Sequence, residues 1–229
     1  NNYFSGSDEE RSADLQFGID HEEVKAIFCA RGGYGSVRIL DSLNWANMLR
    51  EPKWLVGYSD ITVFHQRLNK LGVQSIHGIM PFNYGSNSNQ ALTSLFSALE
   101  NTNYTISAKL NESNCHGKAN GMLIGGNLSI VYSLLGTNDS YLFEDKILFI
   151  EDISPQFSLD KDEKEELFLY LQKALDKKLL NTLKVVIYDQ TTQRITTIKG
   201  LEIKRQPNNT IHFDFSTKKQ RTDTTRKKK

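Results

Sequence analysis

The sequence predicts an α/β protein, with a parallel sheet flanked by helices in an N-terminal domain and a smaller β-rich C-terminal domain. Two observations support this fold class. In the first half of the chain, short apolar segments alternate with stretches of helical periodicity, an order typical of parallel sheets covered by helices. In the second half, three further segments have the apolar content or the alternation of strands.

The composition is that of a soluble globular protein, with 38% apolar and 24% charged residues in a chain of 229. The net charge of +1 hides an asymmetry, because the last thirteen residues carry seven basic residues and one acidic one. The rest of the chain is −5, with 21 basic against 26 acidic residues. We interpret residues 217–229 as a basic, disordered tail, and no aromatic residue is interleaved there to make a nucleic-acid platform.

Neither cysteine usage nor hydropathy suggests a metal site, a disulfide framework or a membrane span. Cys29 and Cys115 have no Cys-x-x-Cys spacing and no paired histidines. No apolar run reaches eighteen residues. We therefore expect no metal, no membrane partner and no nucleic-acid partner.

The N-terminal domain should contain two successive strand, turn and helix units. The first has a helix near residues 8–17, a strand at 24–30, a glycine-rich turn at 31–35 and a helix at 37–43. The second has a strand at 54–56, a helix at 61–71 and a further strand at 73–78. Both glycine-containing turns follow strands of a parallel sheet, so both should lie at the sheet edge where binding sites form.

A polar stretch after the helix at 89–100 marks a domain junction near residue 109. The predicted domains are 1–108 and 109–216, followed by the tail. The elements expected after the junction are a helix at 128–135 capped by Asn127, a strand at 146–150 ending at Glu151-Asp152, a helix at 160–179, and strands at 185–188 and 211–215.

Residues 53–65 form the corner most suggestive of chemistry, because an apolar strand turns through Gly57 into a helix with Ser59 at the tip. A serine at such a corner resembles a nucleophile elbow, although the second glycine of Gly-x-Ser-x-Gly is absent. On spacing alone, Ser59 or Asp60 is more readily explained as a helix cap.

The loop at 31–35 and the acidic residue Glu151 are also ambiguous when taken alone. The loop, Arg-Gly-Gly-Tyr-Gly, matches neither Gly-x-Gly-x-x-Gly nor the Walker A pattern. It could hold phosphate, contribute to an oxyanion hole or simply turn the chain. Glu151 could be a buried functional carboxylate or the plain end of a strand.

Taken together, these segments resemble the LD-carboxypeptidases, serine peptidases that trim murein tetrapeptides and that include microcin immunity peptidases. The resemblance covers residues 3 to about 153 and fades beyond them. Its motifs are Gly6 to Arg11 with Ala13-Asp14-Leu15, Lys25 to Gly35, Gly57 to Thr62, His77-Gly78, Gly121 with Gly125 to Leu128, Leu135-Gly136-Thr137, and Ile147 to Asp152.

The resemblance implies a Ser-His-Glu triad without metal or cofactor. Ser59 would be the nucleophile and Glu151 the acidic member. The backbone N–H groups of Asp60 and of the Gly32-Gly33 loop would form the oxyanion hole. The substrate-binding residues would be Arg31, Tyr34 and His77.

Compared with the family, the chain lacks an N-terminal strand and helix and the glycine-rich Gly-His segment that carries the family's histidine. His212 is the only histidine after Glu151. It shares a strand face with Asp214, opposite Ile211 and Phe213, and this pattern favours a solvent-facing pair. His212 is therefore a weak candidate for the general base.

The function implied by the resemblance is release of terminal D-alanine from murein tetrapeptides during cell-wall recycling, in the cytoplasm, with a homodimer compatible with it. Two alternatives stay open: a catalytically inactive peptide-binding relative and a microcin-type immunity peptidase. A phosphate or nucleotide binder is disfavoured, because the loop lacks the motif lysine.

Overall fold

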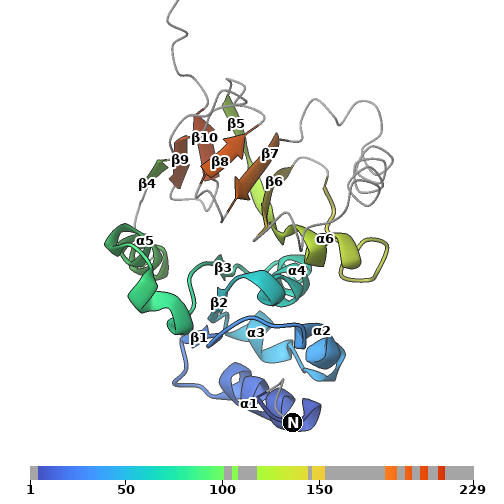
Figure 1. Cartoon of the computed structure of the whole chain (residues 1–229). Helices are drawn as coiled ribbons and strands as arrows, with labels where there is room; N and C mark the ends of the chain where they lie inside the picture. Colours follow the sequence, from blue (N-terminus) through green and yellow to red (C-terminus); the bar gives the residue numbers. More distant parts are fainter. Residues whose placement is uncertain are drawn as a thin grey trace, which may run out of the picture.

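The fold is known from a computed structural model of the chain. It describes residues 5–100, 105–107, 118–143 and 146–152, and the four strands at 184–189, 194–197, 202–205 and 211–214. The helix expected at 160–179, the tail at 217–229 and Cys115 lie outside these residues. Figure 1 shows two units, with the N-terminal elements grouped around one sheet and the later strands in another.

The N-terminal unit is a three-stranded parallel sheet in the order β1-β2-β3, with helices around it. The register pairs Phe28 with Val56 and Gly57 with His77. The elements are α1 (Asp8–Asp20), β1 (Ala26–Phe28), α2 (Ser36–Ile39), η1 (Leu40–Ser42), α3 (Ala46–Arg50), β2 (Trp54–Gly57), η2 (Ser59–Ile61), α4 (Thr62–Lys70), β3 (Ile76–His77), η3 (Pro81–Ser86) and α5 (Asn89–Leu99).

The C-terminal unit is a seven-stranded mixed sheet in the order β4-β9-β10-β5-β6-β7-β8. Its centre, β5-β6-β7, is parallel, and the remaining pairs are antiparallel. The elements are β4 (Thr105–Ser107), β5 (Lys118–Asn127), α6 (Leu128–Ser133), β6 (Lys146–Asp152), β7 (Lys184–Asp189), β8 (Arg194–Thr197), β9 (Glu202–Arg205) and β10 (Ile211–Asp214). The predicted α/β class is confirmed.

Local signals explain where three of the helices begin. Ser7 and Glu10 form a capping box at the start of α1, because the Ser7 hydroxyl accepts from the Glu10 N–H and the Glu10 carboxylate accepts from the Ser7 N–H. Ser88 caps α5 through its hydroxyl, which accepts from the Ala91 N–H, and Asn127 caps α6 as predicted. The capping of α1 and α5 by serines was not part of the sequence prediction.

The predicted helix at 37–43 is wrong in its extent, because the chain there divides into two short segments, α2 and the 3-10 helix η1. The extended conformation of Leu43 ends the second segment. The predicted strand at 73–78 shortens to the two residues of β3, which pair with the end of β2. α3, η3, β4, β5, β8 and β9 were not predicted.

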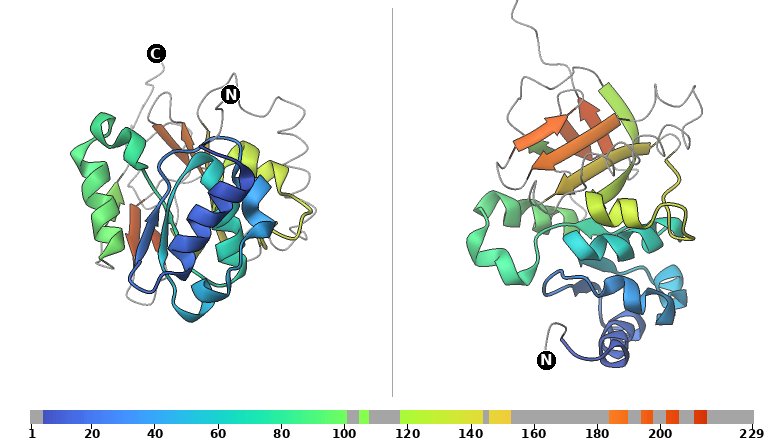
Figure 2. Two further views of the ribbon diagram at one scale, coloured as in Figure 1. Left: turned by 90° about the horizontal axis from the view of Figure 1, so that it is seen from below. Right: turned by 45° about the vertical axis from the view of Figure 1, so that its right-hand side comes forward.

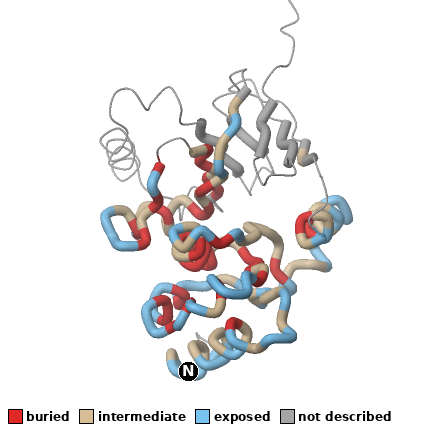
Figure 3. Tube along the Cα trace, turned by 180° about the vertical axis from the view of Figure 1, so that it is seen from behind, coloured by how far each residue is buried: buried red, intermediate tan, exposed pale blue. Residues whose placement is uncertain are grey.

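Two hydrophobic cores correspond to the two sheets. The first is built around β2 and α4, with Leu55, Phe64 and Leu68 among its buried members, and it includes Leu134 from the turn after α6. The second lies between α6 and β6, with Val131 and Leu148. Figure 3 shows buried residues gathered in α4 and in the parts of the C-terminal unit that approach it.

The two units meet along α4, which Figures 1 and 2 show between the two sheets with α6 beside it. The Asn127 N–H donates to the Thr62 hydroxyl at 3.0 Å, joining the end of β5 to the start of α4. A Cβ on Gly126 would lie 2.5 Å from the Thr62 hydroxyl oxygen, so only glycine allows this approach. At the other end of α4, the Arg67 guanidinium forms a bidentate ion pair with Asp139.

Candidate active site

Ser59 occupies a sharp corner between β2 and the helix that follows. Its φ of 61° is in the left-handed region, and Ser59 is the one non-glycine residue with positive φ in the described part of the chain. Such a conformation costs on the order of 1–3 kcal/mol and persists only where surrounding packing holds it. Gly57 permits the close packing, because a Cβ there would lie 2.8 Å from Ile61.

The helix-cap explanation of Ser59 and Asp60 is wrong. Neither η2 nor α4 has a side-chain hydrogen bond at its N-terminus. The buried Asp60 carboxylate instead points to the glycine loop, where it accepts from the N–H groups of Gly35 at 3.0 Å and Ser36 at 2.9 Å. Asp60 therefore ties the loop at 31–35 to the Ser59 corner.

The glycine loop passes directly against Ser59. A Cβ built on Gly32 would lie 3.2 Å from the Ser59 Cβ, 3.4 Å from its Oγ and 3.6 Å from the Asp60 nitrogen. Gly33, in contrast, has open space around the position of a Cβ. The two segments that the sequence selected separately thus form one constellation of a hydroxyl and backbone amides.

Glu151 approaches this constellation from the C-terminal sheet. It lies in β6, where the parallel register aligns it with Asn127 of β5 and Tyr188 of β7. Its side chain is only 1% exposed, and its Oε1 lies 3.9 Å from the Nε2 of His77 in β3. A strand of each unit therefore contributes to one contact across the junction.

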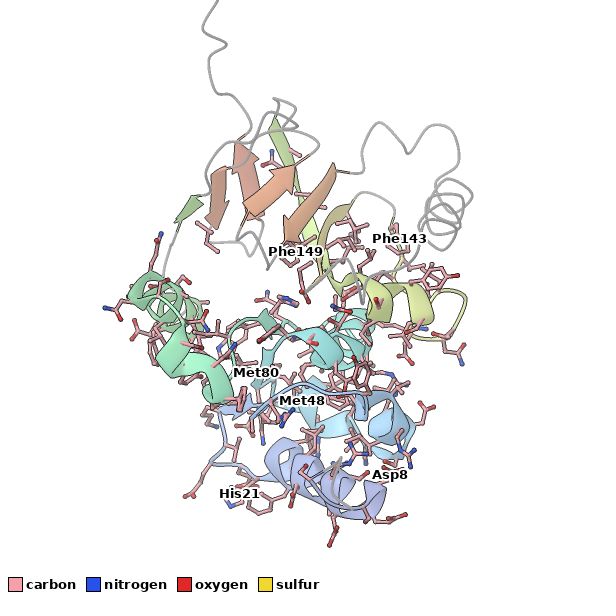
Figure 4. The ribbon with its side chains drawn as sticks, in the orientation of Figure 1. Asp8, His21, Met48, Met80, Phe143 and Phe149 are labelled. Carbon is pink, nitrogen blue, oxygen red and sulfur yellow. The ribbon has the colours of Figure 1, made fainter. Side chains whose placement is uncertain are left out.

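His77 is enclosed by aromatic rings and a second histidine. Its ring packs edge-on against Phe149 at 5.3 Å between centroids and lies 6.3 Å from Tyr58 and 5.8 Å from His65. Figure 4 labels Phe149, which lies on the side of the C-terminal sheet that faces the N-terminal unit. Burial, assisted by the neighbouring His65, lowers the pKa of His77 to about 3. This lowered pKa favours the neutral imidazole at pH 7.

His65 contacts the backbone of the Ser59 corner through a hydrogen bond to Gly57. It was not selected from the sequence as a site residue. Its Nε2 lies 2.9 Å from the carbonyl oxygen of Gly57, which can only accept, so this nitrogen carries the proton. Its Nδ1 then accepts from the Ser75 hydroxyl at 2.8 Å. Burial lowers the pKa of His65 to about 4. Its apolar helical position did not distinguish it from an ordinary core residue.

The predicted substrate-binding residues of the loop are exposed. Arg31 lies over the ring of Phe82, with its guanidinium carbon 5.4 Å from the ring centroid. Tyr34 and Phe82 are 80% and 77% exposed. Tyr58 next to Ser59 accepts a hydrogen bond from Asn83 at 2.7 Å, and burial raises the pKa of its phenol. Two segments, 31–35 and 81–86, thus surround the corner.

The structure does not bring His212 to this site. The register of β10 pairs His212 with Asn120 of β5, whereas Glu151 pairs with Asn127 of the same strand. Seven residues of extended strand correspond to roughly 20 Å. Ser59, Asp60, Gly32 and His77 belong to one neighbourhood with Glu151, and His212 lies well away from it.

Two negative findings apply to the residues that the structure describes. No group of three or more histidine, cysteine, aspartate or glutamate side chains there could hold a metal ion. No helix in that part of the chain is long and apolar enough to cross a membrane.

Burial raises the pKa of the Cys29 thiol to about 12, which leaves it in the neutral form.

The fold and the strained serine corner are typical of α/β serine hydrolases. Two sequence profiles give the family. The LD-carboxypeptidase N-terminal domain matches residues 1–78, and the LD-carboxypeptidase C-terminal domain matches residues 120–211. This chain belongs to the LD-carboxypeptidase family.

Curated relatives agree with this assignment. A probable murein peptide carboxypeptidase from Bacillus subtilis strain 168 is 36% identical over 166 residues, covering 69% of this chain and 52% of the relative. A murein tetrapeptide carboxypeptidase from Pseudomonas aeruginosa is 30% identical over 172 residues, covering 69% of this chain and 56% of the relative. The matches thus span about half the length of these relatives.

Solved structures share the fold. A muramoyltetrapeptide carboxypeptidase from Oxalobacter formigenes superposes with a TM-score of 0.71 at 24% identity, covering 95% of this chain and 86% of that chain. The microcin C7 self immunity protein MccF superposes with a TM-score of 0.66 at 19% identity, covering 95% and 83%.

Proposed function

We propose that this protein is a serine-type LD-carboxypeptidase that releases the terminal D-alanine from murein tetrapeptides in cell-wall recycling, without metal or cofactor. One observation carries the proposal: Ser59 is held at φ 61°, and Gly32 approaches it so closely that a Cβ on Gly32 would lie 3.4 Å from the Ser59 Oγ. The names of the curated relatives, which are murein peptide and murein tetrapeptide carboxypeptidases, indicate the substrate class.

In this proposal, the Ser59 Oγ attacks the carbonyl carbon before the terminal D-alanine, and a base accepts the hydroxyl proton. The carbonyl oxygen becomes an oxyanion that faces the N–H of Asp60 and an N–H of the Gly32-Gly33 loop. Loss of one such donor costs on the order of 3 kcal/mol of transition-state stabilisation. Collapse of the tetrahedral intermediate expels the D-alanine amine, which takes up the proton, and water then hydrolyses the acyl-enzyme.

In a Ser-His-Glu triad the carboxylate orients the histidine that accepts the serine proton and stabilises the resulting imidazolium, and Glu151 takes this place in the scheme. Its almost complete burial in β6 suits that task, because a carboxylate in a dry site interacts strongly with a nearby cation. One of its carboxylate oxygens lies 3.9 Å from the Nε2 of His77 in the N-terminal unit. His77 thereby lines the site without acting as the base.

The histidines whose side chains the structure describes are poor candidates for the base. His65 has both ring nitrogens engaged, and the lowered pKa of His77 makes it a weak proton acceptor. His21 lies at the end of α1, on the far side of the N-terminal unit from Phe149 (Figure 4). This observation favours a second candidate function, a peptide-binding relative that retains the site but turns over little substrate.

We also propose the domain division 1–108 and 109–216 with the tail at 217–229, a cytoplasmic location and a homodimer. Limited proteolysis that cuts first near residue 109 and after residue 216 would support the division. Cell fractionation tests the location. Light scattering distinguishes a 26.1 kDa monomer from a dimer of twice that mass.

The first experiment measures D-alanine release from a murein tetrapeptide by the native chain and by Ser59→Ala. We expect the substitution to abolish release, because removal of the nucleophile of a serine triad typically costs about 10⁶ in kcat. Ser133→Ala is the matched control, since Ser133 is an exposed serine on α6 that bonds only to the Ile130 carbonyl. Release that is unchanged in Ser59→Ala would overturn the nucleophile assignment.

A fluorophosphonate probe distinguishes the two candidate functions, because covalent labelling requires an activated hydroxyl. A peptidase should be labelled at Ser59, and the label should be absent from Ser59→Ala. Tetrapeptide binding without labelling or release would instead identify the chain as a binding relative.

A further inference from the structure

Arg31 is an exposed cation placed beside the candidate nucleophile. It directly precedes Gly32, where an added Cβ would lie 3.4 Å from the Ser59 Oγ. The carbonyl of Ala30, on its other side, accepts from the N–H of Phe82 at 3.1 Å. The loop at 31–35 is therefore held on both sides of Arg31, by the contact with Ser59 and by the hydrogen bond to the segment 81–86.

The side chain of Arg31 is also positioned. Its guanidinium stacks on the ring of Phe82, an aromatic residue that is otherwise 77% exposed. A guanidinium that uses its face for an aromatic ring keeps its N–H edge available, and that edge matches the geometry of a carboxylate. The stacking thus presents a planar pair of donors at low entropic cost.

Within the described part of the chain, Arg31 differs from the other arginines near this unit. Arg11 and Arg38 bind Asp8, Arg50 binds Asn47, and Arg67 binds Asp41 and Asp139. Arg31 makes no hydrogen bond or ion pair to a described residue, and its contact there is the ring of Phe82. The nearby Asp60 carboxylate is occupied by two backbone N–H groups. The N–H groups of the Arg31 guanidinium are therefore available to bind an anion.

We propose that Arg31, supported by Phe82, binds the free C-terminal carboxylate of the peptide substrate and so restricts the enzyme to removal of the last residue. This inference rests on the proposed function, in which Ser59 is the nucleophile. In a peptide attacked at its last amide, the terminal carboxylate lies one residue beyond the scissile carbonyl, roughly 3.5 Å along the chain. Arg31 is the residue next to Gly32, which closely approaches Ser59, so the loop places this cation near the end of the bound peptide.

The test compares two substrates, a murein tetrapeptide with a free terminal carboxylate and the same peptide ending in D-alaninamide. The native chain should prefer the free acid. Arg31→Gln should lower kcat/KM for the acid roughly 10- to 150-fold, the range expected for hydrogen bonds to a charged group, and leave the amide nearly unchanged. Arg31→Lys should recover part of the loss, and Phe82→Leu should raise KM for the acid more than it lowers kcat.

Arg50→Gln is the matched control, because Arg50 is an exposed arginine of α3 that bonds to a neighbouring amide. It should leave both substrates unaffected. Thermal unfolding midpoints of all variants should agree within a few degrees, since Arg31 is exposed. An equal loss on acid and amide in Arg31→Gln, or a native chain that hydrolyses both equally, would overturn the proposal.

Binding measurements test the carboxylate site independently of the proposed peptidase activity. Calorimetry on Ser59→Ala, with and without Arg31→Gln, measures the affinity for the acid and the amide without turnover. If the native chain releases no D-alanine but binds the acid in an Arg31-dependent way, the proposed activity fails and the carboxylate site stands. If affinity for the acid is independent of Arg31, the carboxylate site fails whatever the activity.

Discussion

At the scale of single residues, the strained conformation of Ser59 is held by hydrogen bonds to the residue two positions before it. The Gly57 carbonyl accepts from the Gly78 N–H at 3.0 Å and from His65 Nε2 at 2.9 Å. A carbonyl fixed by two donors cannot rotate to relax the corner. His65 is thus a positioning residue, linked through Ser75 to the strand that carries His77.

His65 also makes stability depend on pH. Its pKa is about 4 in the folded chain and near 6.5 when unfolded, so the unfolded state binds more protons between these values. The free energy of unfolding should therefore be insensitive to this group above pH 7 and fall as pH drops from about 6.5 to 4. The full loss should be on the order of 3 kcal/mol, and urea unfolding from pH 7 to pH 5 should already show part of it.

The comparison that isolates this effect uses two histidine variants. His65→Gln should be less stable at pH 7 and have a flatter pH dependence between pH 7 and 5, with the slope that remains coming from His77, whose pKa is also lowered. His21→Gln, at the end of α1, is the matched control for loss of a histidine outside the corner. A native slope retained in His65→Gln would show that another group is responsible.

At the scale of elements, the site is formed by two strand-to-helix connections of a parallel sheet, which hydrogen bonds join to each other. The glycine loop follows β1 and the Ser59 corner follows β2, and parallel pairing brings both to the same edge. Asp60 joins them by accepting from two N–H groups at the start of α2. A helix of four residues has little stability of its own, so this carboxylate helps to hold its first turn.

Asp60→Ala should leave the buried N–H groups of Gly35 and Ser36 without their acceptor, at about 1–3 kcal/mol for each group. We expect a loss of stability of about 2–4 kcal/mol in urea unfolding, together with a large fall in kcat, because the Gly32 backbone would no longer be held against Ser59. Asp60→Asn should be intermediate, since one amide oxygen remains to accept.

Asp14→Ala, which removes an exposed carboxylate of α1, serves as the control for Asp60 and should change stability by less than about 0.5 kcal/mol. If Asp60→Ala kept native stability and activity, the hydrogen bonds of Asp60 would not be what holds the glycine loop at the Ser59 corner.

At the scale of the whole molecule, the candidate site depends on how the two units are joined, because Ser59 belongs to one sheet and Glu151 to the other. α4 makes the junction at both of its ends, through Thr62 with Asn127 and through Arg67 with Asp139. The Arg67 and Asp139 side chains are 18% and 9% exposed, and the ion pair raises the pKa of the guanidinium further. A bidentate, poorly solvated pair is stronger than a surface ion pair.

Breaking this pair should weaken both stability and activity. In a double-mutant cycle of Arg67→Ala and Asp139→Ala, we expect a coupling energy of about 1–3 kcal/mol from unfolding measurements. The single variants should also lower kcat/KM, because the position of Glu151 relative to Ser59 would be less well defined.

Asp41 provides the internal control, since it contacts the same guanidinium but is 91% exposed. Asp41→Ala should cost less than about 1 kcal/mol and leave activity intact. A coupling energy near zero for Arg67 and Asp139 would mean that the junction is held by packing alone.

The sequence by itself determined the α/β class, the order of the main elements and the residues worth testing. Local signals suffice for these: β2, α5 and β6 follow from apolar content and periodicity, and the start of α6 follows from Asn127. The glycine loop, the Ser59 corner and Glu151 were ambiguous on spacing alone, and the resemblance to the LD-carboxypeptidases singled them out. Chain-local physics, namely hydrophobic pattern, turn geometry and capping, carries this information.

Only the tertiary structure decided which residues of these motifs contact one another and which lie apart. Whether Asp60 caps its own helix or braces a loop 25 residues earlier depends on the pairing of β1 with β2. The neutral state of His77 depends on its burial among Tyr58, Phe149 and His65, and the separation of His212 from Glu151 depends on strand register. These outcomes arise from contacts between segments distant in sequence, and desolvation and register have no local signature.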